Sequence, residues 1–287
     1  MIAALPGTSA HRAAVLGSPV AHSLSPALHL AGFAAAGLTG WTYSRIECDA
    51  VALPGLVAAA GPEWAGFSVT MPGKEAAAAA ADVRSARVDL LGVANTLWHG
   101  PKGWHAENTD VDGVCGALGA AGVAPHRVLV LGGGGTARSV VAALAELHVE
   151  ELVLAGRRPQ STWACVELAR RVGLPVTASD LEPANVARVA AEVDLVVSTV
   201  PAGAADHLAA VLAGVPALLD VLYHPWPTPL AAASVPGRTT VTGLDMLLHQ
   251  SFRQFELFTG RPAPMVEMRA GLQLASGAGL PLPIGAR

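Results

Sequence analysis

Short apolar runs alternate with helical patterns along most of the chain. In the first third, the runs at 13–16, 42–47 and 66–70 are typical of strands, and 26–36 and 74–81 are typical of helices. The second of these helical stretches consists mainly of alanine, the best helix former. This alternation predicts an α/β fold.

The alternation becomes more regular from Val128 onward. The run at 128–131 is continuously apolar, as expected for a parallel strand that is buried on both faces. Strands of this type, separated by helices, predict right-handed βαβ units and a doubly wound parallel sheet. Further strands are predicted at 152–154, 175–177, 194–198 and 217–221, with helices at 136–147, from Ser161, near Asn185 and near Leu208.

The chain is expected to form two domains. A Gly/Ala-rich segment leads into Val128, which places the boundary near Asp112. One well-formed helix is predicted over 244–258, followed by a tail rich in glycine and proline. A length of 287 residues is sufficient for two domains with ample cores.

Composition narrows the class of protein. Hydrophobic residues make up 52% of the chain and charged residues 14%, with a formal net charge of −4 and no basic cluster, so no nucleic-acid partner is expected. The three cysteines are far apart, which argues against a disulfide framework and a zinc site, and no metal is expected. No signal peptide or membrane span is evident, so we expect a cytoplasmic protein without a membrane partner.

A glycine-rich loop follows the predicted strand at 128–131. Gly132-Gly133-Gly134-Gly135-Thr136-Ala137 fits G-x-G-x-x-A, with a strand before it and a helix after it. Gly132 would allow a tight turn, Gly134 a close approach to a pyrophosphate, and Ala137 close packing of helix on strand. The helix N-terminus would supply free N–H groups to the phosphates. Four glycines could simply form a flexible turn, but this context favours a dinucleotide site.

The end of the next strand indicates which dinucleotide. NAD-binding units usually place an acid there to accept a hydrogen bond from the ribose 2′-hydroxyl. Here the strand ends in Leu154-Ala155-Gly156-Arg157-Arg158, without an acid. Two guanidinium groups suit a 2′-phosphate, although a solvated arginine pair is the alternative. NADP is therefore the expected cofactor.

The first third holds two candidate ligand-binding segments. In "GSPVAHSLSP", Ser23 and Ser25 either cap the next helix or direct two hydroxyls at a ligand. In "GFSVTMPGK", Lys74 falls in the first turn of a predicted helix and is a candidate proton donor or acceptor. A plain surface lysine is the alternative.

Two further segments place Asn and Thr at predicted strand-to-loop transitions. Asn95-Thr96 offers amide and hydroxyl groups, and Asn108-Thr109-Asp110 adds a carboxylate, which suits a polyhydroxylated ligand. Routine turn chemistry is the alternative, since Asn and Asp favour turns.

Together, and in this order, these segments resemble the shikimate dehydrogenase family over nearly the whole chain. The serine segment is similar to the family's N-terminal substrate motif, and Val69 to Lys74 to its V-T-x-P-x-K motif. Seven motifs in register are far more specific than one. The others are Asn95-Thr96, Asn108-Thr109-Asp110, "GGGGTAR" at 132–138, Asp220-Val221-Leu222-Tyr223 and "GLDMLLHQ" at 243–250.

The departures from the family pattern are modest. The family often has Asn where Ser68 and Leu30 stand, and it commonly has Gly directly after N-T-D, where this chain has Val111. These positions concern the fine shaping of the substrate site. The family's N-R-T cofactor segment is here Gly156-Arg157-Arg158, which keeps an arginine but changes its surroundings.

The resemblance implies NADP-linked, reversible reduction of 3-dehydroshikimate to shikimate in aromatic amino acid biosynthesis. It implies that Lys74 and Asp110 act on the reacting hydroxyl, and that the hydroxyls of Ser23 and Ser25 hold the substrate carboxylate. An extended segment would place those two side chains on one face. We interpret His22 as structural. Further substrate-binding residues implied by the family are Thr70, Asn95, Tyr223 and Gln250; cofactor-binding residues are Gly132, Gly133, Gly134, Gly135, Thr136, Ala137, Arg157, Arg158, Thr199, Val221, Gly243 and Met246.

The resemblance also implies an arrangement of domains. Residues 1–112 with 243–287 would bind the substrate, residues 113–242 would form a Rossmann-type NADP domain, and the active-site cleft would lie between them. A monomer or homodimer that acts on a small molecule is expected. The alternatives are a quinate or aminoshikimate dehydrogenase of the same family and a catalytically silent NADP-binding regulatory protein.

Overall fold

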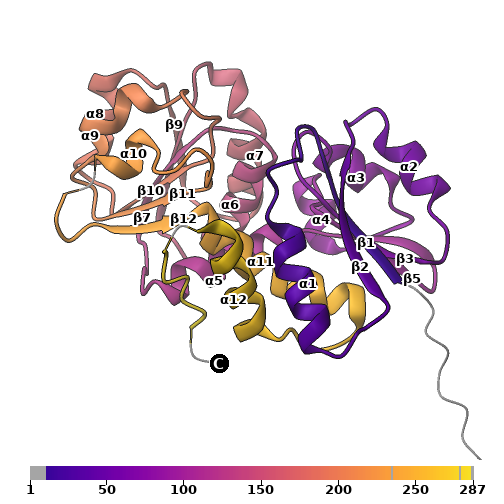
Figure 1. Cartoon of the computed structure of the whole chain (residues 1–287). Coiled ribbons are helices and arrows are strands. Elements are labelled where there is room, and N and C mark those ends of the chain that lie inside the picture. The colour runs from indigo at the N-terminus through magenta and orange to yellow at the C-terminus, as the bar shows by residue number, and fades with distance from the viewer. Residues whose placement is uncertain (1–10, 234, 278, 286–287) are drawn as a thin grey trace, which may run out of the picture. The chain divides into compact units, whose positions relative to one another are not determined.

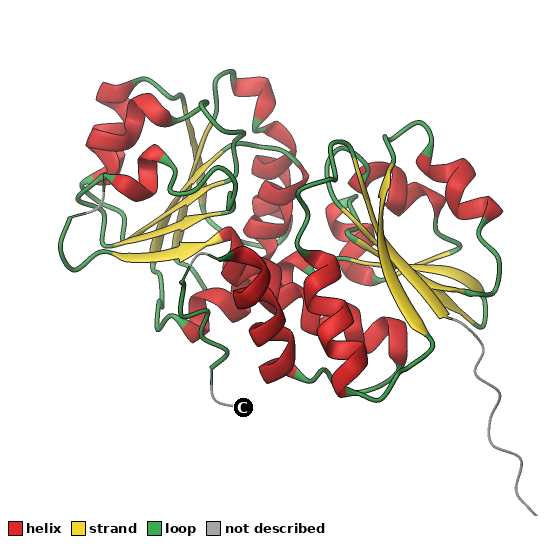
Figure 2. Cartoon of the chain, viewed as in Figure 1, coloured by secondary structure: helices red, strands yellow, loops and turns green. Residues whose placement is uncertain are grey.

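The computed structural model describes residues 11–233, 235–277 and 279–285. The chain forms two compact units, shown by secondary structure in Figure 2. The first unit runs to Glu107 and includes Ser251–Gly279, and the second comprises Asn108–Gln250 and the segment from Leu280 on. No helix in the described part of the chain is long and apolar enough to cross a membrane.

The first unit is built on a mixed six-stranded sheet with the strand order β2-β1-β3-β5-β6-β4. Strands β2 and β3 both pair with β1 in parallel, whereas β5 is antiparallel to β3 and to β6. The elements are β1 (His11–Gly17), α1 (Ser25–Ala35), β2 (Trp41–Glu47), α2 (Leu53–Ala59), β3 (Trp64–Val69), α3 (Lys74–Ala80), β4 (Val83–Arg84), α4 (Ala86–Leu91), β5 (Thr96–Gly100), β6 (Gly103–Glu107) and α12 (Met265–Ser276).

The second unit is built on a parallel six-stranded sheet with the order β12-β11-β10-β7-β8-β9. The elements are α5 (Asp110–Ala120), β7 (Arg127–Leu131), α6 (Gly135–Glu146), β8 (Glu151–Ala155), η1 (Pro159–Ser161), α7 (Trp163–Arg171), β9 (Val176–Ser179), α8 (Pro183–Ala190), β10 (Leu195–Ser198), η2 (Asp206–Leu208), α9 (Ala209–Leu212), β11 (Ala217–Asp220), α10 (Pro229–Ala232) and β12 (Thr239–Thr242). Helix α11 (Gly243–Thr259) begins in this unit and ends in the first.

Helices cover both faces of the second sheet. Helix α6 packs against α5 and α7, and α9 packs against α8 and α10, on the other side of the strands (Figure 1). Strand β10 is buried along its whole length, as is β7 from Val128 to Leu131, which explains the apolar runs at 195–197 and 128–131. If β7 to β12 are numbered 1 to 6, the strand order is 3-2-1-4-5-6, which is typical of a dinucleotide-binding sheet. The predicted α/β fold with a doubly wound sheet is confirmed.

The Gly/Pro-rich tail after residue 258, for which no helix was predicted, contains helix α12. Its residues lack a strong apolar stripe, and the helix depends on packing against α1. Two glycines allow this close approach: a Cβ on Gly271 would lie 2.6 Å from Ala31 Cβ, and one on Gly32 would lie 3.0 Å from Met268 Cγ. Such a contact between distant segments leaves no local signal in the sequence.

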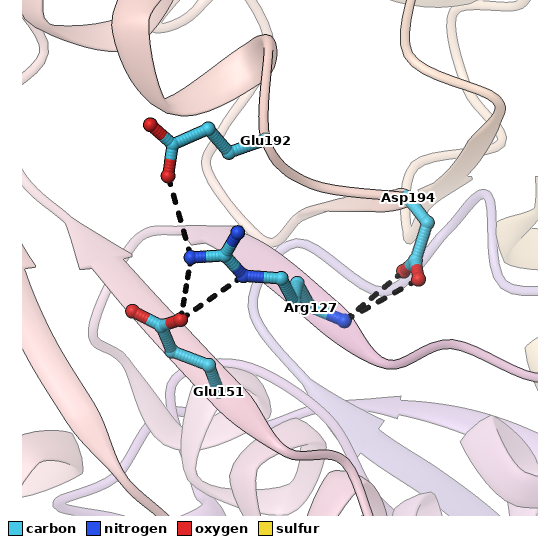
Figure 3. A network of polar contacts seen from close by, with 4 residues as sticks. All are labelled: Arg127, Glu151, Glu192 and Asp194. Atoms are coloured by element: carbon cyan, nitrogen blue, oxygen red, sulfur yellow. Dashed lines mark hydrogen bonds and ion pairs between the residues drawn. The ribbon is translucent and has the colours of Figure 1, made fainter.

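Arg127 joins the starts of three strands of the second sheet (Figure 3). Its guanidinium donates to Glu151 Oε2 on β8 at 2.7 Å and to Glu192 Oε2 at 3.3 Å, and its backbone N–H donates to Asp194 Oδ1, just before β10, at 3.3 Å. Ligands of doubly wound sheets bind beyond the carboxyl ends of the strands. This partly exposed cluster lies at the amino ends, so we interpret it as structural.

His29 lies in an aromatic cluster in the first unit. It is fully buried on α1, its ring stacks on Tyr43 with the centroids 4.4 Å apart, and Phe33 and Phe258 are the next ring neighbours. Burial lowers the pKa of His29 to about 3. The cationic form is therefore disfavoured in the folded protein and favoured in the unfolded chain below its ordinary pKa of about 6.5.

We expect the stability of the first unit to fall as the pH drops from about 6.5 toward 3. Because the folded pKa is depressed, the stabilisation is present above 6.5, and protonation of the unfolded chain removes about 2 kcal/mol of it by pH 5. The difference in free energy of unfolding between wild type and His29→Phe should therefore change by that amount between pH 8 and pH 5 in urea titrations. The exposed His99→Gln is the matched control, and an unchanged difference for His29→Phe would contradict this account.

Candidate active site

In the first unit, the loops that follow β1 and β3 are joined at the carboxyl ends of these parallel strands. Thr70 N–H donates to Leu16 O at 2.8 Å, and Ser18 N–H donates to Met71 O at 3.0 Å. A Cβ on Gly17 would collide with the Thr70 side chain, so glycine is needed for this approach. The serine segment and the "VTMPGK" segment, far apart in sequence, therefore begin side by side.

Asn95 lies on the same side of the sheet, at the carboxyl ends of β1 and β3. It directly precedes β5, and because β5 runs antiparallel to β3, its amino end meets the carboxyl end of β3. Val69 N–H donates to Asn95 O at 2.7 Å, and Ala94 N–H donates to Lys74 O at 2.9 Å. The prediction that Asn95 follows a strand is wrong, but the antiparallel direction of β5 gives it a place at this edge.

The hydroxyls of Ser23 and Ser25 converge, although not as predicted. Their Oγ atoms are 3.2 Å apart and both residues are buried. The segment is a turn, with Ser23 N–H donating to Val20 O, and Leu24 at φ −93° and ψ 0° is not extended. Ser25 is the first residue of α1, so the positive end of the helix dipole lies at the serine pair and favours an anion there.

Lys74 and Asp110 each begin a helix. Lys74 is the half-buried first residue of α3, and Asp110 is the buried first residue of α5. Asn108, two residues earlier, accepts a hydrogen bond from Ser139 on α6 at 3.1 Å. Lys74 belongs to the first unit and Asp110 to the second, so their joint action on one hydroxyl stays a prediction.

Gln254 on α11 is a buried polar residue that sequence reasoning missed. Its Nε2 donates to Thr96 Oγ1 at 2.9 Å and to Asn95 O at 3.2 Å, and its Oε1 accepts from Ser68 Oγ at 2.8 Å. Ser68 in turn accepts from Tyr43 OH at 2.6 Å, and burial raises the pKa of Tyr43, which keeps this donor protonated. One amide thus fixes the segment that carries Asn95. The helical spacing of four from Gln250 was the only available signal.

In the second unit, the glycine loop between β7 and α6 has backbone features that suit a dinucleotide. Gly132 has φ +106°, in the left-handed region that favours glycine. A Cβ on Gly133 would lie 2.7 Å from the carbonyl carbon of Ser161, so the protein itself excludes a side chain there. At Gly134, by contrast, no described atom lies within 4 Å of an added Cβ. This open approach to the backbone, just before the N-terminus of α6, fits a pyrophosphate.

The predicted 2′-phosphate residues and Thr199 lie next to this loop. Gly132 N–H donates to Ala155 O at the end of β8 at 2.9 Å. The exposed Arg157 and Arg158 come two and three residues after Ala155. Thr199 follows β10, and its Oγ1 donates to Leu131 O at 2.8 Å. These contacts gather the carboxyl ends of β7, β8 and β10 around the loop.

The start of α11 gathers four further predicted residues. A Cβ on Gly243 would collide with Val221 O, so these two residues are in direct contact. A Cβ on Gly113 of α5 would lie 2.8 Å from Met246 O and 3.0 Å from Gln250 Cβ. The helix that begins at Asp110 therefore packs tightly against the turns of α11 that carry Met246 and Gln250.

Asp220 holds the loop that carries Tyr223. This buried carboxylate accepts from Thr228 Oγ1 at 2.6 Å and from Leu222 N–H at 3.2 Å. Burial raises the pKa of Asp220, against the effect of these hydrogen bonds. The acid of the D-x-x-Y segment thus stabilises the loop conformation.

Two family models and a relative of known name match this chain. Residues 15–97 match the family model described as shikimate dehydrogenase substrate binding domain, and residues 243–273 match the shikimate 5'-dehydrogenase C-terminal domain. Shikimate dehydrogenase (NADP(+)) of Methylobacterium radiotolerans is 38% identical over 90% of this chain and 95% of that protein.

Two crystal structures resemble this chain over most of its length. Shikimate dehydrogenase of Mycobacterium tuberculosis is 51% identical with a TM-score of 0.87, covering 92% of this chain and 99% of the other. The shikimate 5-dehydrogenase of Thermus thermophilus, solved with NADP(H) and shikimate, is 32% identical with a TM-score of 0.81, covering 92% and 99%.

We expect Gln254→Met to destabilise the protein by about 1–3 kcal/mol. The thioether is of similar length but leaves the buried Ser68 hydroxyl and the Thr96 hydroxyl without their amide partner. Urea unfolding at neutral pH measures the loss. Arg253→Met, at the adjacent exposed position of the same helix, is the matched control; an equal loss in both variants would show that the network is not responsible.

Proposed function

This chain belongs to the shikimate dehydrogenase family, and we propose that it catalyses the reversible, NADP-linked reduction of 3-dehydroshikimate to shikimate. The observation that carries this proposal is the match, over 90% of the chain, to a relative named for that activity. The glycine loop after β7 and the serine pair at α1 support it independently, because they supply a dinucleotide cradle and a neutral anion-binding pair.

The residues of the second unit fit NADP. The backbone at Gly132 to Gly135 and the N-terminus of α6 would hold the pyrophosphate, and Arg157 and Arg158 the 2′-phosphate. Thr199, Val221, Gly243 and Met246 would contact the remainder of the cofactor. When bound, the nicotinamide supplies the hydride chemistry.

The substrate is held by hydroxyl and amide groups. Ser23 and Ser25 bind its carboxylate with two neutral donors, assisted by the dipole of α1. Thr70, Asn95 and Gln250 bind ring hydroxyls. Tyr223 approaches from the cofactor side.

Proton transfer is assigned to Lys74 and Asp110. In the reduction, the ammonium group of Lys74 stabilises the negative charge that develops on the carbonyl oxygen and donates a proton to it; in the oxidation, the neutral amine of Lys74 accepts the proton of the hydroxyl. The carboxylate of Asp110 orients the ammonium group. The proposed division of labour assigns substrate binding to residues 1–112 with 243–287, and NADP binding to 113–242.

The biological setting follows from the same proposal. We assign the reaction to the shikimate pathway, toward chorismate and the aromatic amino acids, in the cytoplasm, with the protein acting as a monomer or homodimer. None of the three cysteines, all of which lie in the described part of the chain, forms a disulfide, as is usual in a reducing compartment.

Initial rates with shikimate and quinate, each with NADP and NAD, test the function. We expect turnover of shikimate with NADP to exceed the other three combinations. Preference for quinate would identify the family alternative. Binding of NADP without turnover of either substrate would identify a regulatory protein and overturn the proposal.

Replacing Arg157 by Ala should raise the Michaelis constant for NADP and spare that for NAD. The loss should correspond to about 1.5–3 kcal/mol, as for a hydrogen bond to a charged group. Steady-state kinetics at saturating shikimate measure both constants. An equal loss with the two cofactors would contradict the assignment of Arg157 to the 2′-phosphate.

Lys74 and Asp110 should behave as a unit in a double-mutant cycle. Lys74→Ala should lower turnover by about two to four orders of magnitude, and Asp110→Asn somewhat less, because it keeps a polar partner. The double variant should be little worse than Lys74→Ala, with NADP binding by fluorescence titration nearly unchanged. Losses that multiply would show that the two side chains act independently.

A further inference from the structure

Strand β2 supports the serine segment along one face. Its alternate residues Tyr43, Arg45 and Glu47 share that face and pair in register with Ala13, Val15 and Gly17 of β1. Arg45 Nε donates to Ser23 O at 2.8 Å, and Glu47 Oε2 accepts from Val20 N–H at 3.2 Å. This edge strand therefore holds the turn between β1 and α1 through two hydrogen bonds.

Arg45 is the cation that is bound to the serine pair's own backbone. Its Nε holds Ser23, and the rest of the exposed guanidinium has no hydrogen-bond or ion-pair partner among the described residues. A guanidinium carries five donors and is charged at any working pH. Its charge is therefore available to an anion that binds the hydroxyls of Ser23 and Ser25.

The charges around the turn differ in where they act. Glu47 is bound at Val20, near the beginning of the turn, whereas Arg45 is bound at Ser23, which carries one of the two hydroxyls. Because the Debye length is about 8 Å at physiological ionic strength, a charge bound at the backbone of Ser23 acts with little screening on an anion at the hydroxyl of the same residue. The two serines alone are neutral and cannot distinguish a carboxylate from an ester by charge.

We propose that Arg45 is a positioning and specificity-determining residue, which makes the Ser23–Ser25 site selective for a carboxylate over an uncharged group. It does so by fixing the Ser23 carbonyl through Nε and by placing a positive charge beside the hydroxyl pair. This inference rests on the proposed function for the identity of the substrate. It adds a charged residue outside the serine motif to the recognition of the acid.

The test is steady-state kinetics of Arg45→Gln at saturating NADP with shikimate and with its methyl ester. The Michaelis constant for shikimate should rise about tenfold, and turnover at saturation should stay within about twofold. The ester should be much less affected. In the wild type, the Michaelis constant for shikimate should rise as ionic strength increases from about 0.1 M to about 1 M, where the Debye length falls from about 10 Å to about 3 Å, and this dependence should flatten in the variant.

Three companion variants separate charge from loop order. Arg45→Lys keeps the charge and should recover most of the affinity for shikimate. Glu47→Gln removes the opposite charge from the same turn and should not raise the Michaelis constant. Arg84→Gln changes an exposed arginine on β4, at the far edge of the same sheet, and should resemble the wild type.

Two results would overturn the inference. One is an equal loss for shikimate and its ester in Arg45→Gln; the other is an equal loss in Arg45→Gln and Glu47→Gln, which would show that only the order of the turn matters. The assay of the wild type distinguishes a failure of this inference from a failure of the proposed function. Wild type that does not turn over shikimate would overturn both, whereas an active wild type with an unaffected Arg45→Gln would overturn this inference alone.

Discussion

Backbone hydrogen bonds join three loops at the carboxyl ends of β1 and β3 in the first sheet. These loops carry polar side chains of the proposed substrate site. The bonds from Thr70 to Leu16, from Ser18 to Met71 and from Ala94 to Lys74 join the segments after β1, after β3 and before β5. Because parallel β1 and β3 end where antiparallel β5 begins, residues from three distant stretches meet there. The proposed substrate site depends on this mixed strand pattern.

Side chains of α11 and β2 support these loops, with Gln254 buried and Arg45 and Glu47 exposed. Gln254 makes two hydrogen bonds to the Asn95 segment and accepts one from Ser68 of β3, and β2 holds the serine turn through Arg45 and Glu47. A buried polar network of this kind is favourable only when its members are satisfied, and Gln254 uses both its donor and its acceptor atoms. The hydroxyls proposed to bind substrate are therefore positioned before any ligand arrives, which lowers the entropic cost of binding.

Much of the fold was predictable because its signals are local. The buried strands β7 and β10 contain the apolar runs 128–131 and 195–197, and the glycine loop is bounded by a strand and a helix, so the doubly wound sheet followed from the sequence. Helix α12 and strand β5 were missed, because α12 depends on tertiary packing and β5 on pairing with β3 and β6. The convergence of Ser23 and Ser25 was expected for the wrong reason, since a turn and not an extended segment produces it. Arg45 and Gln254 carried no motif, and only their contacts identify them.

The most direct test of the account is a crystal structure of the protein with shikimate and NADP. We expect the substrate carboxylate within about 2.5–3.2 Å of Ser23 Oγ and Ser25 Oγ, with the reacting hydroxyl at Lys74 Nζ. A carboxylate bound at Lys74, with ring hydroxyls on the two serines, would contradict it.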